Sequence, residues 1–332
     1  MVKSMTKNPK ALVLAAFAAV YLIWGSTYLG ILLAIKTIPP FFMAASRFVI
    51  AGLILLIYAL IKGERIPDLK SVWKISLAGI LMLSVGNALV AWVEQYLPSG
   101  LVAILVATVP LWFVILDKRQ WKFHFSNRQI VLGLVVGFAG VILLFAGKGS
   151  SDLFDSRMKI ISLALMLVCT IGWTIGSLYS KYQKIQGSTL MKVAIQMLAA
   201  GIINFAGGFA LKEHQGFILQ NISWESVGAL IYLIVMGSLV AYLAYVWLLS
   251  IRPASLVGTY AYVNPVVAVF LGWLIADEHV NTQKIIGLLI VIAGLVIVNF
   301  SKEKKVANSK DSSTKTELED LQPSGMAGRE AS

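Results

Sequence analysis

The chain is poor in charged residues and almost devoid of cysteine. Charged residues make up 13% of its 332 residues, against about 25% in soluble domains. Its single cysteine, Cys169, cannot form an internal disulfide and says little about the redox compartment. The three histidines, His124, His214 and His279, fall in expected loops, and no two have the spacing of metal ligands. A GxxxxGK(S/T) phosphate-binding loop is also absent. We therefore expect no metal, no cofactor, no catalytic residues and no nucleotide hydrolysis by that motif.

Apolar residues fill most of the remaining chain. Hydrophobic residues make up 58%, against about 45 to 50% in soluble domains. Runs close to the ~20 residues needed to cross a ~30 Å hydrocarbon layer occur repeatedly. They predict an all-α membrane protein with ten transmembrane helices, at 11–35, 41–61, 75–95, 99–117, 130–147, 159–180, 191–211, 226–249, 254–276 and 284–300.

The net charge of +12 follows this topology rather than forming a nucleic-acid surface. Most lysines and arginines outside the apolar runs fall on the side of the N-terminus, which predicts that both termini are cytoplasmic. Residues 1–10 form a basic cytoplasmic leader, and the apolar run after it is too long for a cleaved signal peptide, the alternative. Residues 301–332 are rich in Ser, Lys, Glu and Asp, which predicts a disordered cytoplasmic tail.

One unit of sequence occurs twice. PSGLVAILVATVP at 98–110 returns as PASLVGTYAYVNP at 253–265, and each copy leads into a glycine-rich run, GLVVGFAGVILL or GLLIVIAGLVIV. Trp24 aligns with Trp173, and Arg47 with Gln196. The pattern predicts two five-helix repeats, at 11–147 and 159–300. Because five is odd, the second repeat enters the membrane from the opposite side, as in transporters that alternate between two faces.

Prolines and glycines recur at matching places in both repeats. Pro110 and Pro265 lie in the middle of apolar runs, where proline kinks a helix. These helix kinks could work as gates or be static. The glycines of the two glycine-rich runs let helices approach closely. Packing within one chain is the commoner explanation, and the face of a homodimer is the alternative.

Two ionisable residues lie inside predicted spans. Arg47 is about 9 Å from the external end of its helix at 1.5 Å per residue, and we expect Glu94 at a similar depth near the external end of its own. Such groups are expensive in a bilayer and usually functional. They could bind the charged ends of a zwitterionic solute or carry coupling protons. As the alternative, they form an ion pair that holds two helices together.

Polar and aromatic residues share faces of several spans. Spans 1 and 6 carry tryptophans near their middle, too deep for interfacial anchors. Apolar and aromatic walls with a few polar groups favour amphipathic organic solutes over bare ions. We predict a substrate cavity lined by Trp24, Tyr28, Asn87, Trp173, Ser177, Tyr242, Tyr245, Tyr260 and Asn264.

Several strings resemble the drug/metabolite transporter superfamily, specifically its EamA branch. They are IWGSTYL at 23–29, SRFVIAG at 46–52, GNALVAWVEQYLPSGLVAILVATVPLW from Gly86 and NPVVAVFLGWLIADE from Asn264. The resemblance covers about residues 11 to 300. It implies a ten-helix exporter of amino acids or other small metabolites in the cytoplasmic membrane, with helices 5 and 10 peripheral to a central cavity. Family members usually have Gly-Glu where this chain has Asp277 and Glu278.

The sequence therefore predicts a secondary or facilitative transporter. We expect it to export amino acids or other small amphipathic metabolites by alternating access, with a small-molecule solute and the lipid bilayer as its partners. A channel-like uniporter is the alternative, weakened by the apolar Leu105 and Val109. A membrane-embedded enzyme ranks last, because no constellation of catalytic groups is evident.

Overall fold

The structure is a computed structural model that describes residues 9–97, 99–145, 156–183, 185, 187–215, 217–275, 282–283, 285–287, 289–294 and 296–297. Most of the leader expected at 1–10, most of the loop after 147 and the whole tail from 301 lie outside the described residues. All regular structure in the described part is helical. The expectation of an all-α protein is confirmed for this part of the chain.

Six helical stretches are long and apolar enough to cross a membrane. Four are single helices, and the other two contain a π-helical section. In chain order the stretches are α1 (Pro9–Ala34), α2 (Pro40–Ile61), α3 (Leu69–Gly79) with η1 (Ile80–Ala88) and α4 (Leu89–Val93), α9 (Arg157–Tyr182), α10 (Thr189–Ala210), and α11 (Trp224–Tyr232) with η5 (Leu233–Tyr242) and α12 (Leu243–Ile251). Each is at least 22 residues long, enough for ~30 Å of hydrocarbon at 1.5 Å per residue.

Two predicted spans are broken into shorter helices. The first is α5 (Ser99–Val106) followed by α6 (Val109–Leu116), and the second is α13 (Ala254–Val257) followed by α14 (Tyr260–Ile275). Each break contains a threonine whose hydroxyl donates to the carbonyl three residues earlier, Thr108 to Leu105 and Thr259 to Leu256, both at 2.7 Å. The backbone amides of the two threonines donate to the same carbonyls, which makes a tight three-residue turn.

The two helix breaks lie before the prolines and not at them. Pro110 is in the first turn of α6, where a missing amide costs no helical hydrogen bond. Pro265 lies inside α14, and the break at Gly258 and Thr259 comes before it. Both breaks thus precede the prolines that suggested them.

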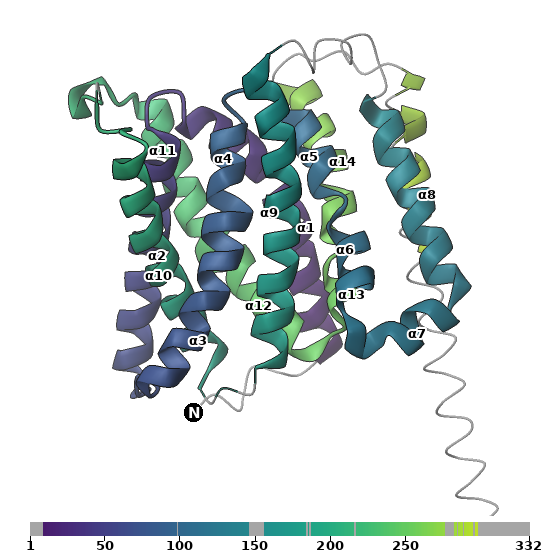
Figure 1. Ribbon diagram of the computed structural model, residues 1–332, viewed down its shortest axis with the longest axis horizontal. Coiled ribbons are helices and arrows are strands. Elements are labelled where there is room, and N and C mark those ends of the chain that lie inside the picture. Colours follow the sequence, from purple (N-terminus) through teal and green to yellow (C-terminus); the bar gives the residue numbers. More distant parts are fainter. Residues whose placement is uncertain are drawn as a thin grey trace, which may run out of the picture.

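The helices that directly follow α6 lie at one edge of the bundle. α6 leads through η2 (Lys118–Gln120) and α7 (Trp121–Ser126) into α8 (Arg128–Phe145), which stands apart from α1, α2 and α10 (Figure 1). A short turn, η4 (Leu219–Asn221), lies between α10 and α11. The predicted tenth span, 284–300, is described only in pieces, so a count of ten helices is not fully established.

The glycine-rich runs of the two halves pack against each other. A Cβ atom at Gly140 would lie 2.6 Å from the backbone nitrogen of Val291 and 3.0 Å from the carbonyl oxygen of Gly287. A Cβ atom at Gly294 would lie 2.7 Å from the carbonyl oxygen of Gly133. Such backbone contact is the usual purpose of small residues in membrane helices. These glycines face a partner within the same chain.

Helices α2 and α10 form a close antiparallel pair. A Cβ atom at Gly52 would lie 3.0 Å from the backbone nitrogen of Leu198, and one at Gly201 would lie 3.0 Å from that of Val49. A carboxylate after each helix contacts the start of the other helix, and of these two only that of Glu213 accepts from backbone amides. Glu213, after α10, accepts from the amides of Phe41 and Phe42 at the start of α2. Glu64, after α2, accepts from the hydroxyl of Ser188 at the start of α10.

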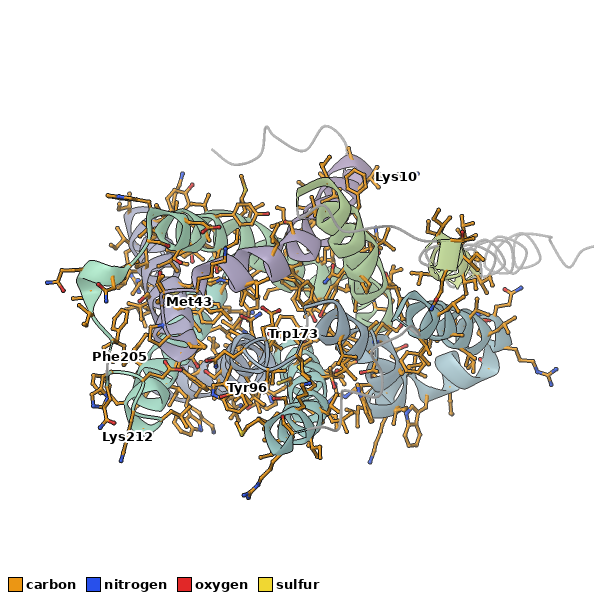
Figure 2. The ribbon with its side chains drawn as sticks, turned by 90° about the horizontal axis from the view of Figure 1, so that it is seen from above. Lys10, Met43, Tyr96, Trp173, Phe205 and Lys212 are labelled. Atoms are coloured by element: carbon orange, nitrogen blue, oxygen red, sulfur yellow. The ribbon has the colours of Figure 1, made fainter. Side chains whose placement is uncertain are left out.

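The outside of the bundle is apolar and its centre is aromatic. Large side chains such as Ile57, Ile202 and Phe205 are about half exposed or more, as expected of a surface that faces lipid. Seen from above, Trp173 lies near the middle of the bundle and Phe205 at its edge (Figure 2). We call the end where α1 begins, at the bottom of Figure 1, the lower end, and the opposite end the upper end.

Candidate substrate cavity

A cavity lies between α1, α2, η1, α4, α5, α6, α9 and α14. Its volume is about 560 Å³, open space at its mouth included. Most of its walls come from the middle or the upper half of these helices, so it occupies the upper half of the bundle. Seven predicted site residues line it: Trp24, Tyr28, Arg47, Asn87, Trp173, Tyr260 and Asn264.

Aromatic rings form the floor of this cavity. The ring of Trp24 lies 5.4 Å from that of Trp173, 4.9 Å from that of Tyr245 and 4.8 Å from that of Tyr260, measured between centroids. The contacts are mostly edge-to-face or tilted, the arrangements that aromatic quadrupoles favour. Tyr245 is fully buried. We call the three rings that line the cavity, those of Trp24, Trp173 and Tyr260, the aromatic floor, and Tyr245 packs beneath them.

Three predicted cavity residues lie behind the walls rather than on them. The hydroxyl of Tyr245 receives a hydrogen bond from the Trp173 indole at 3.1 Å and shares another with Ser177 at 2.8 Å. Tyr242 donates to the side-chain oxygen of Gln196 at 2.9 Å. Ser177, Tyr242 and Tyr245 therefore support the floor and fix the orientation of its rings.

The two tryptophans of the floor rest against π-helical turns. The Trp24 indole donates to the carbonyl of Gly237 in η5 at 3.2 Å. Trp173 packs on Gly86 in η1. A Cβ atom added to Gly86 would lie 2.9 Å from the Cβ atom of Trp173. π-Helical turns often occur at functional sites. Neither turn was predicted from the sequence, although a glycine occurs in each, Gly86 and Gly237, and glycine often marks a close approach.

Arg47 and Glu94 are both buried, and no ion pair between them occurs in the described structure. The Arg47 guanidinium donates to the hydroxyl of Ser238 at 2.8 Å and reaches the side-chain oxygen of Asn87 at 3.5 Å. It also lies 5.1 Å from the centroid of the Phe48 ring. Both carboxylate oxygens of Glu94 lack a hydrogen-bond partner among the described residues. The alternative of a helix-clamping pair therefore does not describe this arrangement.

Several contacts close the lower end of the bundle beneath the floor. The hydroxyls of Tyr21 and Thr259 share a hydrogen bond of 2.6 Å. Tyr182, at the end of α9, donates to both carboxylate oxygens of Asp117 at 2.8 Å. Lys181 donates to the carbonyls at the end of α12. Together these bonds tie α9 to α6 and α12, so the described helices close the cavity toward the lower end.

Some wall residues were not among the predicted site. Thr27 and Thr170 line the cavity, but their hydroxyls donate to carbonyls of their own helices. Val109 makes part of the wall apolar, and Cys169 contributes the only thiol of the chain. Thr27 and Thr170 could have been found from their three-residue spacing to Trp24 and Trp173. Among the described residues no group of three acidic, histidine or cysteine side chains could hold a metal ion.

Comparison with known proteins decides the family. Residues 10–146 and 160–300 each match the model of the EamA-like transporter family. The chain belongs to the EamA-like transporter family. It is therefore a multi-pass membrane transporter with two EamA domains and not a member of an enzyme family, and the resemblance drawn from its motifs is confirmed.

Relatives of this EamA-like transporter match over most of their length. The uncharacterized inner membrane transporter YedA of Escherichia coli (strain K12) is 34% identical over 289 residues, 86% of this chain and 90% of YedA. The uncharacterized transporter YvbV of Bacillus subtilis (strain 168) is 25% identical, with 91% and 97% covered. A crystal structure of a protein with 17% identity superposes with a TM-score of 0.68 over 87% of this chain and 98% of that one, and supports the fold alone.

Proposed function

We propose that this EamA-like transporter is a secondary or facilitative exporter of the cytoplasmic (inner) membrane, with amino acids or other small amphipathic metabolites as solutes. The observation that carries the proposal is the cavity, which has an aromatic floor, a few polar groups and a closed lower end. Such walls suit a molecule with one apolar and one polar part. The inner-membrane location is supported by the likeness to YedA.

Alternating access by two inverted five-helix repeats is the mechanism we propose. Its support is the agreement of local structure between the halves. Both contain a π-helical turn, a threonine break and a carboxylate that contacts the start of a helix in the other half. The family model also matches each half separately. Repeats related in this way let one chain form two similar states that open to opposite sides.

We propose, on the basis of the positive-inside bias of the sequence, that the lower end and both termini lie in the cytoplasm. In that orientation the cavity belongs to a state closed to the cytoplasm. The channel-like alternative requires a continuous polar path, whereas the floor and the contacts below it block the lower end. We propose a single chain as the transport unit, because the glycines that could form a homodimer face contact each other within the chain.

The proposal is tested with right-side-out and inside-out vesicles and a panel of labelled amino acids and aromatic metabolites. Saturable flux of at least one solute is expected. Calorimetric titration of the purified chain is a second measurement. A transported solute should bind saturably. Absence of saturable flux in both orientations, with and without a pH gradient, would refute transport of the solutes tested.

A further inference from the structure

Three buried oxygen atoms near the cavity lack a hydrogen-bond partner among the described residues. They are the two carboxylate oxygens of Glu94 and the side-chain oxygen of Asn264. Glu94 is only 5% exposed and Asn264 only 2%. Buried polar atoms are nearly always satisfied in folded proteins, so each exception calls for an explanation. These three are all acceptors, and what they lack is a donor.

All three oxygens belong to residues around Tyr28. Tyr28 packs in one buried cluster with Val90 and Val93, the α4 residues that precede Glu94. Tyr28 and Asn264 line the cavity. Glu94 is one turn beyond Val90, another wall residue, at the upper end of α4.

No side chain of the described structure neutralises Glu94. Arg47 is the cation on a neighbouring helix, and its guanidinium is engaged with Ser238 and Asn87. A carboxylate held in a low-dielectric site without a partner is strongly unfavourable. A positively charged group on the transported solute would supply the partner that the Glu94 carboxylate lacks.

The surroundings indicate which kind of cation fits. One carboxylate and one amide oxygen are too few ligands for Ca²⁺ or Mg²⁺, which take six or more oxygens. An ammonium group offers three donors and no acceptor, which complements three bare oxygens. The rings of Trp24 and Tyr260, in contact at 4.8 Å, and of Tyr28 supply the aromatic faces that attract alkylammonium groups.

We propose that Glu94 and Asn264 bind the ammonium group of the transported solute, with the apolar part of the solute resting on the aromatic floor. The substrate class is thus an amine with an apolar or aromatic body. For an amino acid, the carboxylate faces Arg47 across the cavity. This inference rests on the proposed export function and specifies its substrate.

Binding to the purified full chain is the first test, measured by isothermal titration calorimetry. Phenylalanine and phenyllactate differ only in an amino group against a hydroxyl group. Wild type should bind phenylalanine at least tenfold more tightly than phenyllactate. Glu94→Gln should abolish that difference and leave the affinity for phenyllactate within about twofold. Glu94→Asp should retain part of the preference because it retains the charge.

Glu225→Gln is the matched control, because Glu225 is an exposed carboxylate paired with Lys36 at 3.1 Å, outside the cavity. It should bind like wild type. Folding is checked by thermal unfolding in detergent, where Glu94→Gln should be at least as stable as wild type, since it removes an unpaired buried charge. Phenethylamine lacks the carboxylate but retains the ammonium group, so its affinity should also fall in Glu94→Gln.

The outcomes separate the two proposals. If Glu94→Gln weakens phenylalanine and phenyllactate equally, or leaves phenylalanine unaffected, the ammonium site is refuted while wild-type flux still stands. If Glu94→Gln instead removes the response of phenyllactate flux to a pH gradient without changing the preference, Glu94 carries a proton and the ammonium site is refuted. If the preference depends on Glu94 but vesicles show no flux, the site stands and export is refuted.

Discussion

Replacing Tyr182 by phenylalanine should open the cavity at its lower end. The substitution removes one hydroxyl, which donates to both oxygens of the buried Asp117 carboxylate at 2.8 Å. These bonds join the end of α9 to the end of α6. The substitution leaves the ring in place, so the packing of Arg119 over it, at 4.4 Å, is retained. The substitution therefore weakens only the state in which the lower end is closed.

The size of the effect follows from the kind of bond. A hydrogen bond to a charged group contributes about 1.5 to 3 kcal/mol, and removing it strands a buried carboxylate. Tyr182 itself is partly exposed, so water can replace some of the loss and the lower value applies. About 1.4 kcal/mol is a factor of ten in an equilibrium constant. We expect the balance between the two states to shift about tenfold toward the state open at the lower end.

The balance is measured with a cysteine introduced beneath the floor, Ser177→Cys in a Cys169→Ser background, because Ser177 is buried in the described state and becomes accessible when the lower end opens. A membrane-impermeant maleimide is applied to right-side-out and to inside-out vesicles, and the ratio of the two alkylation rates is compared between variants. Tyr182→Phe should raise the ratio of inside-out to right-side-out rates about tenfold. Tyr179→Phe is the control, one turn earlier on α9, because its hydroxyl makes no hydrogen bond in the described structure. An unchanged ratio for Tyr182→Phe, or equal changes in both variants, would refute the role of this contact as a closure.

Three further predictions concern the cavity and its frame. Arg47→Gln should reduce saturable flux at least tenfold at matched expression, because it removes the positive charge on the cavity wall; undiminished flux would take Arg47 out of the site. Gly86→Ala should lower the melting temperature in detergent, since the new methyl would lie 2.9 Å from the Trp173 Cβ and overpacking costs about 1 to 3 kcal/mol. Gly228→Ala, with nothing within 4 Å, is its control and should not show that loss. Glu213→Ala should destabilise the protein by about 0.5 to 2 kcal/mol, as other lost helix caps do; an unchanged melting temperature would contradict the capping role.

The helices themselves could be predicted from the sequence because a bilayer allows few alternatives. Backbone groups in lipid must bond within the segment, so each long apolar run had to be a helix. The cavity also followed largely from composition, since polar and aromatic residues in mid-span must face inward. Trp24, Trp173 and Asn264 were found in this way.

Details that depend on helix register could not be predicted. At 3.6 residues per turn Ser84 and Asn87 would share one face of their helix, but η1 bonds over five residues and changes which side chains share a face. Ser84 donates to the carbonyl of Ala200 instead of lining the cavity. The choice of Ser238 as the partner of Arg47 depends equally on the π-helical turn in η5.

The aromatic floor has a consequence for leakage. Its two tryptophans come from different halves of the chain, and each indole is bonded to the second half, Trp24 to Gly237 and Trp173 to Tyr245. Parting the halves at the floor therefore breaks the Trp24–Gly237 bond and the contacts of the Trp24 ring, whereas the bond between Trp173 and Tyr245 stays within the second half. We expect this layer of packed rings to hold back protons and small ions between turnovers, so that the contacts that shape the cavity also preserve the electrochemical gradient of the membrane.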